Sequence, residues 1–322
     1  MRDLHVVCGG RGFVGQALIA DLKQKGHEVK CVSRGLGQNN CGWSSEPWEI
    51  RDGVEYVNAD LMKPDHAVGV VRDARYVYNL AASVGGIDFI QNNRAACMSS
   101  ALINLNLLRA CHQFGTQRYF FASSACVYSS RDFPITESCA EPATPERGYG
   151  WEKLFGEQVC REYREAGFVD TRAARYFTLY GPGDDKKHNH FPAELCKKIA
   201  TAKILAHKSI ELWGDGSQVR SLLYIDDCVE GTQRIMDSGV TIPLNLSGAE
   251  YASTNQMADL VQSIAGTDLQ VNYVPGVTGV QSRFASNERI HRELDWEPST
   301  GLKEGFEWTY RWWFDKLLKE LR

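Results

Sequence analysis

The chain has 322 residues, 43% of them hydrophobic and 24% charged, which is a typical globular composition and long enough for two lobes. The net charge of −4 argues against a nucleic acid or an anionic membrane as partner, and no apolar run reaches the roughly 20 residues of a membrane span. The ten cysteines include no CxxC pair, and no signal peptide is evident, so we expect reduced thiols in a cytoplasmic protein.

The first segment of the chain follows the pattern strand, glycine turn, helix, strand. An apolar run at Leu4–Cys8 precedes a turn, a helix that ends near Lys25 and a second apolar run at Val29–Val32. This order is typical of a βαβ unit, in which the glycines let a pyrophosphate approach the N-terminus of the helix. A turn with a merely structural role is the alternative. We predict a dinucleotide site that includes Gly9, Gly12, Phe13, Val14 and Gly15.

The identity of the dinucleotide depends on the ends of the next two strands. An Asp or Glu after the second strand binds the ribose 2′-hydroxyl of NAD, but this chain has Ser33 followed by Arg34. A guanidinium suits a 2′-phosphate, so we expect a tightly bound NAD(P), with NADP favoured. Alternatively, Arg34 stacks on adenine or is solvated. Asp60, followed by Leu61, either accepts a hydrogen bond from the adenine amino group or is an ordinary helix N-cap.

Strands and helices continue to alternate through the first half of the chain. The alternation predicts an α/β fold with a doubly wound parallel Rossmann sheet. The expected strands are Glu55–Asn58, Tyr76–Ala81, Arg118–Ala122 and Thr171–Tyr176, and the main helices are Ala95–Phe114 and Tyr149–Ala166. At the end of the strand Tyr76–Ala81, the small residues Ala81 and Ala82, which follow Leu80, would let the backbone approach the cofactor. We predict a cofactor-binding domain at 1–177 and a smaller α/β substrate-binding lobe at 178–322, with segments that return to the first domain.

Three residues in this half suggest reversible oxidation of a carbinol. Tyr149 and Lys153 share one helix face, and an ammonium group beside a phenol lowers the pKa of the phenol. Ser124 would hold the same substrate oxygen from the end of a separate strand. The alternative is that Tyr149 and Lys153 are spaced in this way by chance on a surface helix. Cys126 follows closely, and on base rates alone a buried cysteine packs as a small hydrophobic residue.

The second half has fewer clear signals. We expect helices near Phe191–Lys203, Asn255–Ala265 and Phe306–Leu321. Arg220, after a glycine turn, and Arg283 are candidates for bidentate phosphate binding, although surface arginines often have no such role. His188 and His190 form an HxH pair without further ligands, so we expect no metal there, and a catalytic His190 is the alternative to a solvated loop.

Taken together, these segments resemble the extended short-chain dehydrogenase/reductase family of nucleotide-sugar enzymes, the NAD-dependent epimerases and dehydratases. The resemblance covers nearly the whole chain. The segments on which it rests are Gly9–Gly15, Asn79–Ala82, Ser123–Tyr128, Tyr149–Lys153, Arg175–Pro182, Trp213–Arg220, Ile225–Asp227 and Leu294–Trp296.

Within that family, the chain is most similar to the subgroup that epimerises C3 and C5 of GDP-mannose. The resemblance implies that Cys126 exchanges protons at the sugar ring, while His190 stands where the subgroup has a lysine and Thr178 where it has an asparagine. It also implies a homodimer. Further implied contacts are Tyr176 to the cofactor and Gly85, Gly86, Ser124, Lys198, Gln218, Arg220 and Arg283 to the substrate.

The reaction that the resemblance implies is epimerisation at C3, C5 or both through a transient 4-keto sugar. Oxidation at C4 makes the neighbouring protons acidic, Cys126 removes one, and His190 delivers one from the other face. A 4-epimerase, which needs no ring base, and an NADPH-dependent 4-ketosugar reductase are alternatives. A regulator that binds NADP without catalysis is a further alternative from a different class.

Overall fold

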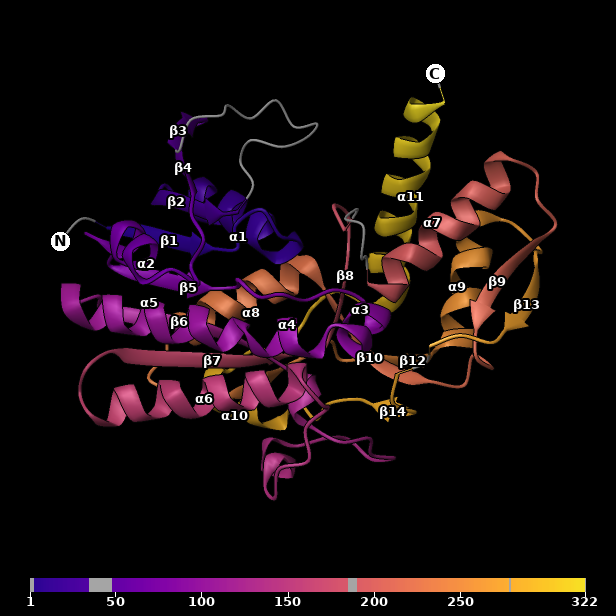
Figure 1. Ribbon diagram of the computed structural model, residues 1–322. Helices are drawn as coiled ribbons and strands as arrows, with labels where there is room; N and C mark the ends of the chain where they lie inside the picture. Colours follow the sequence, from indigo (N-terminus) through magenta and orange to yellow (C-terminus); the bar gives the residue numbers. More distant parts are fainter. Residues whose placement is uncertain (1–2, 35–47, 185–189, 278, 322) are drawn as a thin grey trace.

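The larger part of the protein is built on one eight-stranded sheet (Figure 1). The computed structural model describes residues 3–34, 48–184, 190–277 and 279–321. All neighbouring strands of this sheet are parallel except the hairpin β3–β4. In spatial order the strands are β11 (Leu244–Leu246), β7 (Asp170–Tyr176), β6 (Arg118–Ser124), β5 (Tyr76–Asn79), β1 (Leu4–Cys8), β2 (Glu28–Ser33), β4 (Val54–Asn58) and β3 (Trp48–Arg51).

Helices cover both faces of this sheet, so the doubly wound α/β fold expected from the sequence is confirmed. Along β1, Val6 and Cys8 belong to one core cluster and Val7 to the other, as the alternation of side chains in a strand requires. The first cluster packs under α2 (Pro64–Val71), α5 (Ser100–Phe114) and α6 (Tyr149–Glu165). The second packs under α1 (Phe13–Gln24), α8 (Ile225–Asp237) and α10 (Glu288–Leu294).

A smaller α/β lobe lies at the right of Figure 1. Its four-stranded sheet contains β12 (Tyr251–Ser253), β10 (Val219–Tyr224), β14 (Ser282–Arg283) and β8 (Thr178–Tyr180), and a second sheet pairs β9 (Ser209–Trp213) with β13 (Gln270–Val274). Leu195, Met257 and Phe306 form part of its core. The helices around that core are α7 (Phe191–Ile204), α9 (Thr254–Ala265) and α11 (Leu302–Glu320).

The two parts share a packed boundary. Phe13, Val14 and Ala17 of α1 contact the core clusters of both the large sheet and the smaller lobe. The chain after residue 178 also returns to the large sheet, because β11 pairs with β7 at its edge. In the described part of the chain, no helix is both long and apolar enough to cross a membrane.

The six strands expected in the large sheet lie within two residues of their expected positions. The two edge strands, β3 and β11, were not expected. The helix expected at Ala95–Phe114 is divided at Ser99 into α4 (Arg94–Met98) and α5, and a short α3 (Ile87–Asn92) precedes it. Ser99 Oγ donates to the Ala95 carbonyl at 3.0 Å, a bond that competes with the helical backbone and bends helices.

Candidate active site

The glycine turn after β1 fits a dinucleotide because its backbone leaves no room for side chains. Gly9 has φ +82°, and a Cβ there would lie 2.8 Å from the Leu80 carbonyl and the Ala81 nitrogen. A Cβ on Gly15 would lie 2.5 Å from the Gly9 oxygen. The N-cap of α1, Gly12, has no side-chain cap, so the helix N-terminus presents its backbone donors where an anion binds.

This turn lies at the carboxyl edge of the sheet, between β1 and β5, where doubly wound folds bind their ligands. Phe13 and Val14 are half-buried at the start of α1. Leu80, Ala81 and Ala82 follow β5, and the Asn79 side-chain oxygen accepts the Ala81 N–H at 3.2 Å. The expected cofactor residues of β1 and β5 are therefore brought together, with Gly9 packed directly on the Leu80–Ala81 backbone.

Ser33 and Arg34 mark the end of β2, where Ser33 pairs in register with Asn58 of β4. Arg34 is exposed and forms no hydrogen bond or ion pair with another described residue. The N-cap alternative for Asp60 is wrong, because the N-cap of α2 is Lys63. Asp60 Oδ1 instead accepts the Met62 N–H at 3.2 Å, and Leu61 is buried beside it.

Two glycines place Tyr149 against the end of β6. A Cβ on Gly150 would lie 2.2 Å from the Cys126 backbone oxygen, and a Cβ on Gly156 would lie 2.3 Å from Phe121 Cζ. Helix α6 can therefore lie directly on β6 and on the 3₁₀ turn η1 (Ala125–Val127) that follows it. This close packing puts the first residue of α6, Tyr149, beside Ser124 and Cys126.

Burial controls the ionisation of Tyr149. It raises the pKa of the phenol well above its usual value, the charges of Cys126 and Glu152 add to the effect, and a hydrogen bond to Ser124 opposes it. This is the opposite direction to the one expected from Lys153. The Lys153 ammonium is 5.4 Å from the Tyr149 ring centroid, and its Nζ also lies 3.5 Å from the buried Glu152 carboxylate.

Cys126 lies two residues beyond Ser124, and its backbone N–H donates to Ser124 Oγ at 3.2 Å. Arg283 Nη1 donates to the Cys126 sulfur at 3.3 Å, while Arg283 Nη2 pairs with Glu146 Oε1 at 2.6 Å. Burial raises the pKa of the Cys126 thiol to about 11, with the Arg283 charge opposing the rise and Glu146 adding to it. These surroundings favour the protonated thiol, whose residue is partly exposed to the site.

A buried charge network holds the end of β6 in place. Arg175 on β7 pairs with Glu157 of α6 at 2.7 Å, and Ser123 Oγ donates to the same carboxylate at 2.5 Å. Arg175 also donates to the Tyr128 hydroxyl at 2.7 Å. Because both ends of the Ser123–Tyr128 segment are tied to β7 and α6, the residues between them are held in one arrangement.

The candidates from the smaller lobe are more dispersed. Arg220 and Arg283 stand opposite each other in the parallel pair β10–β14, and burial together with the Arg283 charge lowers the pKa of Arg220 to about 10. Lys198 donates to the Glu211 carbonyl at 3.1 Å and Gln218 to Asp215 Oδ1 at 3.2 Å. Thr178 begins β8 beside β10.

Gly85 and Gly86, two of the expected substrate contacts, lie at the start of α3, and Gly86 is the N-cap of that helix. Tyr176, at the end of β7, shares a 2.7 Å hydrogen bond with Thr232. A cavity of about 570 Å³ lies beside β14, next to Arg283. Its lining residues are Ser130, Arg131, Asp132, Phe133, Gln281 and Ser282.

His190 is the N-cap of α7 and is held by Asp184, whose Oδ2 lies 3.0 Å from both His190 Nδ1 and its backbone nitrogen. The imidazole centroid is 6.1 Å from that of Phe13, which places His190 near the cofactor turn. Among the described residues, no hydrogen bond joins His190 to Cys126, Tyr149 or Lys153. His188 lies outside the described residues.

Sequence reasoning missed Glu146 and Asp184. Both stand close in sequence to recognised candidates, three residues before Tyr149 and six before His190. That proximity was the available signal, but the partner of Glu146 is Arg283, 137 residues away. Backbone hydrogen bonds between the segment that follows Cys126 and the segment around Arg283, such as Arg131 N–H to the Ser282 carbonyl at 3.3 Å and Ile135 N–H to the Phe284 carbonyl at 2.8 Å, bring the two together.

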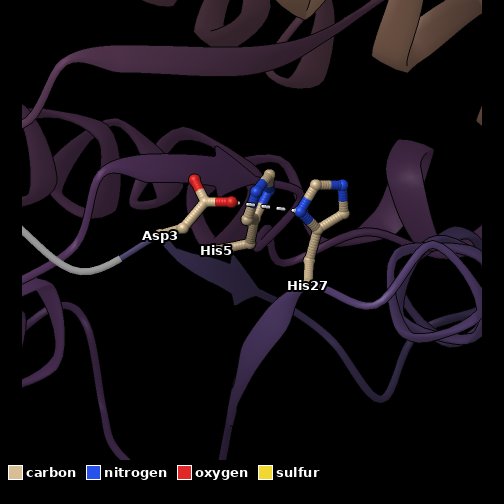
Figure 2. Close-up of side chains that lie close together, drawn as sticks. All are labelled: Asp3, His5 and His27. Carbon is tan, nitrogen blue, oxygen red and sulfur yellow. Dashed lines mark hydrogen bonds and ion pairs between the residues drawn. The ribbon is translucent and has the colours of Figure 1, made fainter.

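A separate cluster of Asp3, His5 and His27 lies at the amino ends of β1 and β2 (Figure 2), away from the edge that carries Tyr149. Asp3 Oδ2 is 3.4 Å from His27 Nδ1, and Asp3 Oδ1 accepts a hydrogen bond from Arg75 at 3.2 Å. The guanidinium already balances the only carboxylate in the cluster and would repel a cation. We therefore assign no metal to these three residues.

Comparison with known proteins shows one family model that matches most of the chain and relatives that match nearly all of it. A model of the NAD dependent epimerase/dehydratase family matches residues 5–246. GDP-mannose 3,5-epimerase 1 of Oryza sativa subsp. indica is 33% identical over 324 residues, which cover 98% of this chain and 82% of that protein. GDP-mannose 3,5-epimerase of Arabidopsis thaliana is 33% identical over 325 residues, with 98% and 83% covered.

A solved structure of UDP-glucose 4-epimerase from Thermotoga maritima, with UDP-glucose, has the same fold. It superposes with a TM-score of 0.86 at 22% identity, over 98% of this chain and 99% of that one. At this level of identity the likeness shows the fold alone.

Proposed function

The chain belongs to the NAD-dependent epimerase/dehydratase family, and we propose that it is a nucleotide-sugar epimerase acting at C3, C5 or both on a GDP-mannose-like substrate. The observation that supports this most is the position of Cys126. Its thiol lies two residues after Ser124, and Gly150 packs Tyr149 directly against its backbone. A group that exchanges a ring proton is thus adjacent to the groups that oxidise the carbinol, whereas a 4-epimerase has no need of it.

In this proposal, Tyr149 takes the proton of the C4 hydroxyl, and Ser124 orients the same oxygen. When bound, NAD(P)⁺ supplies a positive charge and a reversible hydride acceptor. The C4 ketone acidifies the protons at C3 and C5, because the resulting carbanion is an enolate. Cys126 then exchanges a proton with the ring on one face, and His190, held by Asp184, is proposed to act on the other.

We propose NADP as the preferred cofactor. The position that carries a carboxylate in NAD-specific sites is Ser33, and the adjacent Arg34 is exposed at the end of β2. A 2′-phosphate there would meet a guanidinium instead of a repelling carboxylate.

For the substrate, Arg220 and Arg283 are the proposed diphosphate partners. Gly85, Gly86, Thr178, Lys198 and Gln218 remain proposed contacts to the rest of the nucleotide sugar. Arg283 already pairs with the Glu146 carboxylate, whereas Arg220 donates only to the neutral backbone carbonyls of Val219, Val280 and Gln281. We therefore propose Arg220 as the stronger of the two phosphate candidates.

We also propose a homodimer. Met98 and Leu102, which lie on successive turns of α4 and α5, are 41% and 48% exposed, and Trp151 and Phe155 on α6 are both 47% exposed. These helices pack together, so the four side chains can form one apolar patch that a second copy would cover by two-fold symmetry. The cysteines among the described residues are all free thiols, which agrees with the cytoplasmic location that we propose.

The test is incubation with GDP-, UDP-, CDP- and dTDP-sugars in deuterium oxide, followed by mass spectrometry and NMR. We expect a GDP-mannose-like sugar to gain deuterium at C3 or C5 without net consumption of NADPH. The matched control is Cys126→Ala, which should lose epimerisation at C3 or C5 but retain oxidation at C4. Epimerisation without deuterium uptake would instead identify a 4-epimerase, and stoichiometric NADPH consumption would identify a reductase.

A further inference from the structure

Cys126, Arg283 and Glu146 form a compact unit in which one guanidinium contacts both a thiol and a carboxylate. Arg283 Nη1 lies 3.3 Å from the Cys126 sulfur and Nη2 lies 2.6 Å from Glu146 Oε1. We propose that Arg283 and Glu146 control the proton on Cys126, so that the thiol meets the substrate protonated and acts as the proton donor. The catalytic part of this inference rests on the proposed epimerase function, whereas the control of the thiol does not.

The ion pair is fixed from both sides. The Arg283 side chain is 9% exposed and the Glu146 side chain 20%, so solvent does little to screen their charges. The Glu146 N–H donates to the Cys126 carbonyl at 2.9 Å, which anchors Glu146 on the same turn as the thiol. Arg283 Nη2 also donates to the Tyr128 carbonyl at 3.3 Å, and its buried Nε has no protein partner.

The carboxylate and a thiolate would compete for the same cation. A second negative charge on sulfur would have to share Arg283 with Glu146, and burial already disfavours that charge. The other groups that face the thiol are Arg220, whose cation favours a thiolate, and Tyr149 and Ser124, which are neutral. Glu146 is therefore the one anion in this set that opposes ionisation of Cys126.

These charges determine where the proton and the negative charge go in the proposed step. The S–H bond of Cys126 breaks as a C–H bond forms at the enolate carbon, and Arg283 holds the negative charge left on sulfur. A base on the opposite ring face, for which His190 is proposed, removes the original proton. Glu146 touches neither the sugar nor the cofactor in this scheme and is a positioning residue that sets the proton affinity of Cys126.

The experiment measures the thiol directly in the whole protein. Iodoacetamide alkylation is followed between pH 7 and pH 10 on the tryptic peptide 119–131, whose only cysteine is Cys126. Because the thiolate is the reactive form, the rate changes about tenfold for each unit of pKa. Glu146→Gln should lower the pKa of Cys126 by roughly one to three units, and so raise the rate at pH 8 about tenfold or more.

Two further variants separate this effect from a general loosening of the site. Glu141→Gln makes the same change at an exposed position on the same segment and should leave the rate unchanged. The double variant Glu146→Gln with Arg283→Met removes both members of the ion pair. It should lose most of the gain, because the guanidinium that donates to the Cys126 sulfur is gone and only the Arg220 charge still favours a thiolate. An unchanged rate in Glu146→Gln, or an equal gain in the double variant, would overturn the inference.

A second readout tests the direction of proton transfer. If Cys126 is the donor, its protonated form is active, and Glu146→Gln should move the alkaline limb of the deuterium-uptake profile to lower pH. A shifted alkylation profile without turnover of any nucleotide sugar would refute the proposed function alone. Deuterium uptake at C3 or C5 with an unshifted thiol would refute this inference alone.

Discussion

Gly150 sets the distance between helix α6 and the Cys126 turn, and the change Gly150→Ala tests that role. The new Cβ would lie 2.2 Å from the Cys126 oxygen and 3.1 Å from its carbonyl carbon. Relief of the first contact needs a displacement of about 1 Å or more, and both partners are backbone atoms, so no rotamer change can supply it. The start of α6, which carries Tyr149, must therefore move relative to Ser124 and Cys126.

The expected effect on catalysis is larger than the effect on stability. A displacement of about 1 Å at a catalytic group can cost roughly 100-fold in rate. Overpacking costs about 1–3 kcal/mol, which the better helix propensity of alanine offsets by up to about 1 kcal/mol. Turnover should therefore fall about 100-fold, while the free energy of unfolding falls by no more than about 3 kcal/mol.

The assay pairs turnover in deuterium oxide with urea unfolding at the same temperature. Gly69→Ala is the matched control, because Gly69 is an exposed position of α2 where an added Cβ meets nothing within 4 Å. That variant should keep its turnover and gain up to about 1 kcal/mol of stability. Parental turnover in Gly150→Ala would show that the contact between α6 and the Cys126 turn does not position Tyr149.

Three other predictions use independent parts of the structure. Arg34→Glu should reverse the proposed preference from NADP to NAD in a cofactor-binding titration, and an unchanged ratio of the two dissociation constants would remove Arg34 from the 2′-phosphate site. Leu102→Glu should convert a dimer into a monomer in analytical ultracentrifugation, whereas the same change at exposed Leu205 should not. Burial, followed by the charge of His27, lowers the pKa of His5 to about 4. Between about pH 6.5 and pH 4, His5 is protonated in the unfolded chain but not in the folded one. The free energy of unfolding therefore decreases by up to about 3 kcal/mol as the pH is lowered across that window. In urea unfolding, His5→Asn should reduce this decrease.

Much of the large sheet could be predicted from the sequence because its signals are local. The glycine turn after Leu4–Cys8, and the alternation of apolar strands with amphipathic helices, need no knowledge of distant contacts. The division of the helix at Ser99 was not predicted, because the competing bond from its hydroxyl to Ala95 is one of several equally available to a serine. The domain boundary near residue 177 stays a prediction.

The candidate site was predictable only in part, and the reason is again distance along the chain. Ser124, Tyr149 and Lys153 belong to recognisable motifs at the end of one strand and the start of one helix. Arg283 could be named as a phosphate candidate but not as the partner of Cys126 and Glu146, since that contact depends on long-range backbone hydrogen bonds between residues 131–135 and 282–286. The proposed roles of these residues, and of His190, remain to be tested.

The direction of the Tyr149 shift has a consequence for how the site is activated. The Lys153 ammonium lies over the Tyr149 ring, but the adjacent Glu152 carboxylate is 3.5 Å from the same nitrogen and opposes its effect on the phenol. In the protein alone, burial therefore keeps Tyr149 protonated. A base is needed only when a carbinol is to be oxidised, and the positive charge of an oxidised nicotinamide cofactor arrives in that same state. In the proposed reaction, proton removal by Tyr149 would therefore be favoured when an oxidised cofactor is bound.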